Sequence, residues 1–133
     1  EEALRQSGAD GVMIGRGAYG RPWLLGQVAA YLMHGIRTEE PALAEQKSIL
    51  LEHYALMLEH HGAEPGMRIA RKHVAWYSKG LPGSAEFRGS VNHATSVEAV
   101  HALIDGFFDP LIERGVTAVR DAFREAGNGR IAA

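Results

Sequence analysis

Residues 8–23 read Gly-Ala-Asp-Gly-Val-Met-Ile-Gly-Arg-Gly-Ala-Tyr-Gly-Arg-Pro-Trp. The small and apolar run at 11–14 predicts a short buried strand, and the triplet at 15–17 predicts the glycine turn that follows it. Pro22 fits the first turn of a helix, where its missing N–H would have no partner in any case. A strand, a glycine turn and a helix in this order are typical of a βα unit.

The position of this unit limits the fold that can contain it. A parallel strand needs neighbours on both sides, yet residues 1–7 predict only the end of a helix, with Gly8 as its stop. The chain also begins with Glu1 rather than Met. We therefore expect it to be the tail of a larger α/β protein. We also expect the unpaired strand to favour self-association through residues 11–15.

The rest of the chain predicts helices separated by short loops. Apolar residues recur at helical spacing between glycine and proline breaks. The expected helices are 22–34, 41–61, 64–77, 84–92 and 97–109, the last ending before Pro110. Glu39 and Glu40 are interpreted as charges that complement the dipole at a helix start. The fold class is therefore mainly α, with one βα unit followed by a helical bundle and a tail over 113–133 that is partly helical or disordered.

Composition excludes several classes of function. The chain has 133 residues and no Cys, so disulfides, thiolate catalysis and zinc–thiolate sites are absent from it. No apolar run approaches the roughly 18 residues of a membrane span, and no signal peptide is recognisable. We expect a cytoplasmic location without membrane contact. The seven His show no spacing typical of a ligand set, so no metal site is predicted.

Positive charge is concentrated in one segment. The whole chain carries a net charge of −2, but residues 68–88 hold five cations and one carboxylate, which is a net +4 against −6 elsewhere. Residues three, four or seven apart share one face of a helix. The cations on this face would be Arg68, Arg71, Lys72 and Lys79. Such a cluster can contact phosphates, or it can be a solvated helix face.

Two further features have alternative interpretations. The turn Gly15-Arg16-Gly17 can bind a phosphate, because glycine amides approach an anion closely and an arginine adds a charged contact; it can also be only a turn. Trp76 and Tyr77 adjoin the cations and can stack on unpaired bases. Tyr77 recurs with Val74 and Ala70 at helical spacing, which favours a place in the core.

Two stretches together carry a family resemblance. Residues 8–23 resemble the end of the barrel in bacterial tRNA-dihydrouridine synthases. Residues 71–83 read Arg-Lys-His-Val-Ala-Trp-Tyr-Ser-Lys-Gly-Leu-Pro-Gly and resemble the signature of that family's C-terminal helical domain. The similarity is nearest to the B-type branch and runs from residue 1 to about residue 112.

The resemblance implies a fold and an activity. Residues 1–36 would be the end of a (β/α)8 flavin barrel, comprising strand 8 and the following helix, and 37–112 a C-terminal tRNA-contacting helical domain. Enzymes of this family reduce uridine in tRNA to dihydrouridine with FMN and NADPH. Gly15 and Arg16 match the family's contact to the flavin phosphate. The family's catalytic cysteine has no counterpart here, so the chain alone is expected to be inactive and to contribute tRNA binding.

Two alternatives remain open. The helices can form a structural or protein-interaction bundle that does not bind RNA. The chain can also belong to another flavin barrel that acts on a small molecule, although such an enzyme gives no reason for a basic bundle after the barrel.

Overall fold

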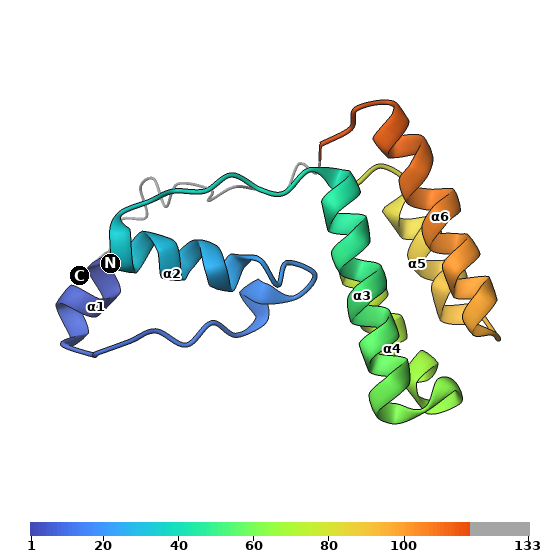
Figure 1. Cartoon of the computed structure of the whole chain (residues 1–133), viewed down its shortest axis with the longest axis horizontal. Coiled ribbons are helices and arrows are strands. Elements are labelled where there is room, and N and C mark those ends of the chain that lie inside the picture. The colour runs from blue at the N-terminus through green and yellow to red at the C-terminus, as the bar shows by residue number, and fades with distance from the viewer. Residues whose placement is uncertain (118–133) are drawn as a thin grey trace, which may run out of the picture.

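The structure, a computed structural model, describes residues 1–117. Its elements are α1 (Glu2–Ser7), the 3-10 helix η1 (Arg16–Ala18), α2 (Leu24–His34), α3 (Leu43–His61), α4 (Ala63–Tyr77), α5 (Ser84–His93) and α6 (Val97–Glu113). Helices α3 to α6 pack together as a bundle, and α1 and α2 lie to one side of it (Figure 1). The mainly helical fold class predicted from the sequence is confirmed.

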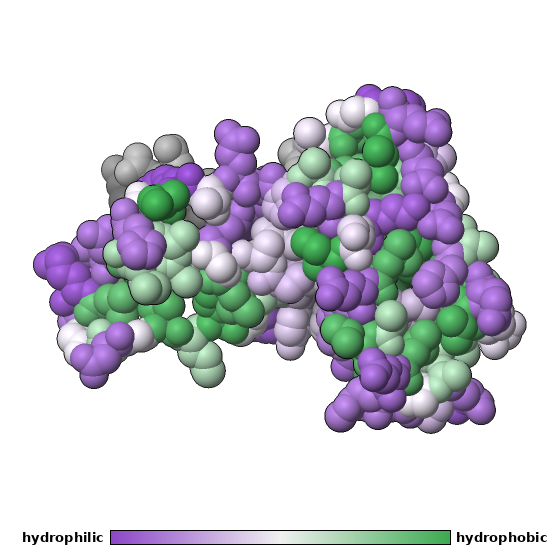
Figure 2. All heavy atoms as spheres, in the orientation of Figure 1, coloured by the Kyte–Doolittle hydropathy of each residue, from purple (hydrophilic) through white to green (hydrophobic). Residues whose placement is uncertain are grey.

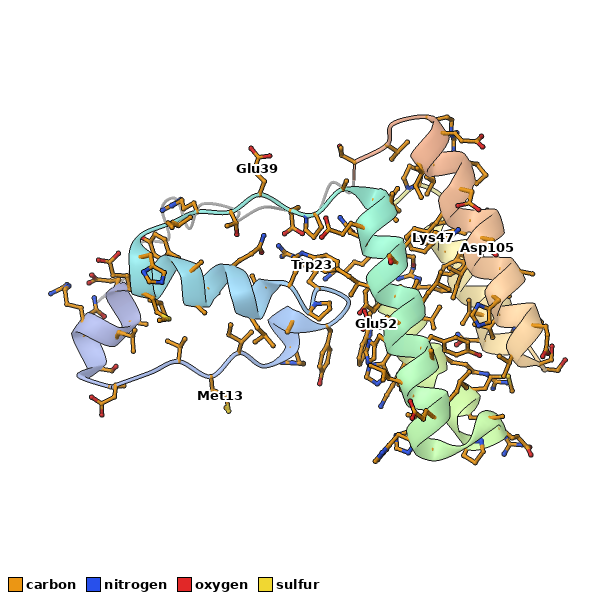
Figure 3. The ribbon with its side chains drawn as sticks, viewed as in Figure 1. Met13, Trp23, Glu39, Lys47, Glu52 and Asp105 are labelled. Atoms are coloured by element: carbon orange, nitrogen blue, oxygen red, sulfur yellow. The ribbon has the colours of Figure 1, made fainter. Side chains whose placement is uncertain are left out.

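The core lies where the four helices of the bundle face one another. Its largest fully buried side chains include Tyr54 of α3, Tyr77 of α4 and Phe108 of α6. Burial of apolar surface on this scale is the main stabilising term for a small bundle. At the edge of the core, Lys47 of α3 contacts Asp105 at 2.8 Å and Asp109 at 2.6 Å, which adds an ionic link to α6 (Figure 3).

The N-terminal part, residues 1–42, is packed much less tightly. Between residues 1 and 42 the only buried residue is Gly20, and apolar side chains such as Leu25, Met33 and Ile36 are exposed. Figure 2 shows apolar surface over this part of the molecule. The two parts of the chain therefore differ in what holds them: the bundle has its own core, whereas the N-terminal part depends on local contacts and on its junction with α4.

The strand predicted over residues 11–14 is wrong. These residues have no regular secondary structure. Met13 is 96% exposed and points away from the rest of the molecule (Figure 3). A strand is stabilised by a ladder of hydrogen bonds to a neighbour, and residues 1–117 contain no strand with which this segment could pair. Self-association through residues 11–15 would supply a neighbour, and it stays a prediction.

Most predicted helix ends are confirmed, with one exception. Helices α1, α2 and α3 each end at the residue before the glycine expected to stop them. The helix expected to end before Pro110 instead continues through it to Glu113. Proline removes one helical hydrogen bond, but Phe108 and Leu111 on either side of it are buried in the core, and their burial outweighs that loss. The tail predicted over 113–133 lies almost wholly outside the described residues.

Gly66 of α4 lies against the backbone of α3. A Cβ atom at this position would lie 2.8 Å from the Met57 carbonyl oxygen and 2.9 Å from the Leu58 Cα atom. We expect Gly66→Ala to lower the free energy of unfolding by about 1–3 kcal/mol, because the two backbones must separate to admit the methyl group. Urea denaturation followed by circular dichroism measures this change.

Gly89→Ala is the matched control. Gly89 lies within α5, and a Cβ atom there would meet nothing within 4 Å. The same substitution should therefore stabilise the chain by about 0.5–1 kcal/mol, since alanine is the better helix former. Equal effects at both positions would contradict the proposed close contact.

Candidate nucleic-acid interface

The structure places three of the four predicted cations at the surface. Arg68 lies in the first half of α4, where it pairs with Glu64 at 2.6 Å one turn earlier. Lys72 follows one turn after Arg68, so the two share a side of the helix. Lys79 is exposed in the turn after α4. Among residues 1–117, neither lysine forms an ion pair, which leaves both ammonium groups available to an anion.

Arg71 is placed differently from the other three. Its side chain is half-buried, and its Nη2 atom donates a hydrogen bond of 2.7 Å to the carbonyl oxygen of Ala94, between α5 and α6. Its Nε atom is buried without a hydrogen-bond partner in the described part of the chain. Arg71 therefore ties α4 to the α5–α6 connection, and its role in RNA contact stays a prediction.

The predicted phosphate loop is open to solvent. Gly15 precedes η1, and its carbonyl oxygen accepts a hydrogen bond from the Ala18 amide at 3.1 Å. A Cβ atom on Gly15 would meet nothing within 4 Å. Arg16 is exposed and forms no ion pair within residues 1–117. An open backbone next to an unpaired arginine suits an anion, while the cofactor contact itself stays a prediction.

The two aromatic residues of α4 have different surroundings. Tyr77 is 1% exposed, which confirms the core position that its spacing favoured. Trp76 is half-buried, and Tyr19 of the N-terminal part stacks on it with ring centroids 4.0 Å apart and planes at 7°. The Trp76 ring therefore already has an aromatic partner within the chain.

Sequence reasoning missed the junction at which the N-terminal part meets α4. Gly20 has a φ of +68°, and a Cβ atom there would lie 2.8 Å from the Tyr77 backbone nitrogen and closer still to the Trp76 carbonyl. Next along the chain, the Trp23 indole Nε1 donates to a Glu40 carboxylate oxygen at 2.5 Å. Arg21 forms an ion pair with the other carboxylate oxygen.

The position of Glu40 in the sequence suggested a free charge at a helix start, but its carboxylate is engaged elsewhere. Its carboxylate is engaged by Trp23 and Arg21, whereas Glu39 points away from the chain (Figure 3). Burial lowers the pKa of Arg21, but an arginine stays charged at neutral pH all the same. The sequence did contain one signal for this contact, the opposite charges of Arg21 and Glu40 before and after α2. Their spacing in the sequence, however, does not indicate that they form an ion pair.

Two half-buried histidines lie beside the aromatic stack. The His73 ring packs edge-on against two other rings, with centroid distances of 4.8 Å to Trp76 and 5.4 Å to His53. A hydrogen bond of 3.1 Å joins His53 Nδ1 and the Tyr77 hydroxyl. Burial lowers the pKa of His53, and burial together with the charges of His53 and Lys72 lowers the pKa of His73. No group of three or more His, Cys, Asp or Glu within residues 1–117 is arranged to hold a metal ion.

A family comparison identifies the class of protein to which this arrangement belongs. The family described as Dihydrouridine synthase (Dus) matches residues 1–111. The match covers most of the sequence, so the chain belongs to the dihydrouridine synthase family. The resemblance based on residues 8–23 and 71–83 is thereby confirmed.

Individual relatives agree with this assignment. A "Probable tRNA-dihydrouridine synthase" of Rickettsia conorii is 50% identical over 113 residues, which are 85% of this chain and 34% of the relative. A "tRNA-dihydrouridine synthase B" of Xanthomonas axonopodis is 46% identical over 121 residues, covering 91% and 36%. A protein of the same name from Pseudomonas aeruginosa is 43% identical over 107 residues, covering 80% and 32%. The chain thus spans about a third of the length of these curated relatives. Among the described helices, none has the length and apolar content to cross a membrane.

We expect the stability of the bundle to fall as the pH drops below the ordinary histidine value of 6.5. Because burial lowers the pKa of His53 and His73, the unfolded chain binds protons at a higher pH than the folded chain, so acidification favours unfolding. Urea denaturation at pH 7.5, 6.5 and 5.5 measures the effect. The double variant His53→Gln/His73→Gln should show a weaker dependence on pH, and His34→Gln, at an exposed position on α2, should not. A double variant with an unchanged dependence would contradict this assignment.

Proposed function

We propose that this chain is the tRNA-contacting, C-terminal part of a flavin-dependent tRNA-dihydrouridine synthase. Residues 37–112 would bind tRNA, and residues 1–36 would complete the end of a flavin barrel. The whole enzyme, an oxidoreductase, would reduce uridine to dihydrouridine and would act in the cytoplasm, where tRNA is modified. The family match over residues 1–111 carries this proposal, and the names of the relatives support the choice of tRNA as the partner.

The exposed cations would provide the RNA contact. Lys72 and Lys79 present ammonium groups that no carboxylate of residues 1–117 neutralises. Arg68 presents a third cation, which is partly neutralised by Glu64. Contacts between such cations and phosphates give an affinity that depends on salt and carries little sequence preference. Choice of the target uridine would come from the barrel, through extrusion of the base.

The residues at 15 and 16 fit the phosphate of a flavin but not its ring. The open Gly15 backbone and the unpaired Arg16 guanidinium would hold the FMN phosphate. FMN, when bound, supplies the hydride carrier between NADPH and the C5–C6 double bond of uridine. Both residues are exposed, whereas cofactor sites bury most of their ligand. The chain alone is therefore proposed to be inactive.

One observation favours the alternative of a protein-interaction bundle without RNA binding. A groove between α5 and α6 is lined mainly by apolar side chains, including Phe87, Leu103 and Phe107. Such a surface suits an apolar partner better than a phosphate. The two functions differ in whether the exposed lysines, Lys72 and Lys79, contribute to binding tRNA.

We expect the chain to bind unmodified tRNA, and Lys72→Ala/Lys79→Ala to weaken this binding. If each lysine contacts one phosphate, the slope of log affinity against log salt should fall by about 2 in magnitude. Fluorescence anisotropy at several salt concentrations measures both quantities. Arg71 is unsuited to this test, because its removal leaves the Ala94 carbonyl without its donor.

Arg5→Ala/Arg37→Ala is the control for charge number, because it removes two exposed cations from the N-terminal part, where Arg5 pairs with Glu2 and Arg37 lies over the Tyr31 ring. It should leave the salt slope nearly unchanged. If the lysine variant keeps its helicity and binds tRNA as the parent chain does at every salt concentration, the RNA contact is assigned to the wrong face. Absence of any tRNA binding would favour the protein-interaction alternative.

We expect the chain to bind FMN too weakly to be detected at micromolar concentrations and to leave uridine in tRNA unreduced when NADPH is added. The physical reason is that Gly15 and Arg16 offer a phosphate contact without enclosing the flavin ring. Isothermal titration and flavin fluorescence quenching measure the binding. A chain that purifies with tightly held yellow cofactor would refute this expectation.

A further inference from the structure

The junction between the N-terminal part and the bundle is built from contacts that converge on one carboxylate. Glu40 lies in the linker between α2 and α3, and its two oxygens receive the Trp23 indole N–H and the Arg21 guanidinium. Arg21 directly follows Gly20, and Trp23 lies two residues further along; the Gly20 backbone lies against the C-terminal end of α4. Glu40 thus joins the linker to the same short segment that touches α4.

The linker offers little stiffness of its own. Residues 36–42 have no regular secondary structure. Gln27 of α2 donates a hydrogen bond to the Glu39 carbonyl at 2.9 Å, and Gln46 of α3 donates one to the Pro41 carbonyl at 2.8 Å. Glu40 sits between these two backbone contacts. The direction in which the chain leaves α2 and enters α3 is therefore set by side chains around Glu40.

The ion pair at this junction is partly shielded from water. The side chains of Arg21 and Glu40 are 23% and 32% exposed, and Arg21 Nε is buried without a hydrogen-bond partner in the described residues. Removing one member of a shielded ion pair leaves the other member's charge unpaired, which is costly. Loss of the Glu40 charge would consequently drive Arg21 toward water and loosen the segment from α4.

We propose that Glu40 is a positioning residue that holds the N-terminal part in one orientation on α4 and so sets the separation between Arg16 and the two exposed lysines, Lys72 and Lys79. This positioning role, called the lock below, depends only on the contacts of Glu40 with Trp23 and Arg21. Its consequence for RNA rests on the proposed function and concerns the chain without FMN, in which the Arg16 side chain is exposed. Cations held at a fixed separation favour an RNA of matching shape over a flexible polyanion, because the second contact then forms at high effective concentration.

Distance measurements on the full 133-residue chain test the lock directly. The chain has no Cys, so Met33→Cys on α2 and Glu52→Cys on α3, both exposed, can be spin-labelled specifically. The parent chain should give one narrow distance distribution. Glu40→Gln, which keeps the shape and loses the charge, should broaden or shift it. Glu39→Gln removes the same charge from the neighbouring exposed residue and should leave the distribution unchanged.

A second variant tests the same contact from its other partner, Trp23. Trp23→Phe keeps an aromatic ring near Tyr77, whose ring centroid lies 6.2 Å from that of Trp23, and removes the indole N–H donor to Glu40 together with part of the ring. It should also broaden the distribution, while circular dichroism shows the bundle intact. If both variants give distributions as narrow as that of the parent, the lock is refuted.

The role in RNA recognition is tested by comparing the affinity of the chain for folded tRNA with its affinity for a polyuridine oligonucleotide. Glu40→Gln should reduce the preference for tRNA by about three- to tenfold and leave polyuridine binding unchanged. An unchanged preference together with a broadened distance distribution would refute the role in RNA recognition and keep the lock. A chain that binds neither RNA would refute the proposed function, and the distance measurement would still decide the lock.

Discussion

Three parts of the molecule meet at the side chain of Tyr77, which is 1% exposed. Its ring faces Trp23 of the N-terminal part, and its hydroxyl forms a hydrogen bond with His53 of α3. The helix that carries it packs against the three other helices of the bundle. A buried tyrosine combines a large apolar surface with one polar group that must find a partner. The position of α4 is therefore set from several sides at once, and only its outward side is left for charged residues.

Two adjacent residues of α4, Arg71 and Lys72, have the same charge but different surroundings because of the way α4 is packed. An α-helix turns by about 100° per residue, so neighbours in sequence point in different directions. Arg71 reaches the Ala94 carbonyl and joins α4 to the loop before α6, whereas Lys72 faces solvent. The arginine guanidinium has five donors, so one can bond to a carbonyl inside the molecule, while the exposed lysine ammonium is strongly hydrated and stays at the surface. Both belong to one basic stretch in the sequence, yet Arg71 already bonds within the chain and Lys72 is exposed without an ion pair in residues 1–117.

The successes and failures of prediction follow the range of the interactions involved. Helix ends at Gly8, Gly35 and Gly62 are local events, and they were predicted correctly. The strand at 11–14 was predicted wrongly because a strand needs a partner, and no apolar run contains that information. The extension of α6 through Pro110 was missed because burial of the last turn, a tertiary effect, outweighed a local rule.

The sequence by itself determined the mainly helical fold, most of the helix boundaries, the basic stretch on α4 and, through residues 8–23 and 71–83, the family. These depend on composition, periodicity and local order, which sequence records directly. Only the tertiary structure decided that the two motifs touch, that Arg71 is bound internally and that Glu40 joins Trp23 to the linker. Each of those contacts joins residues far apart in the chain. Their partners are set by how the helices pack, which the spacing of residues in the sequence does not show.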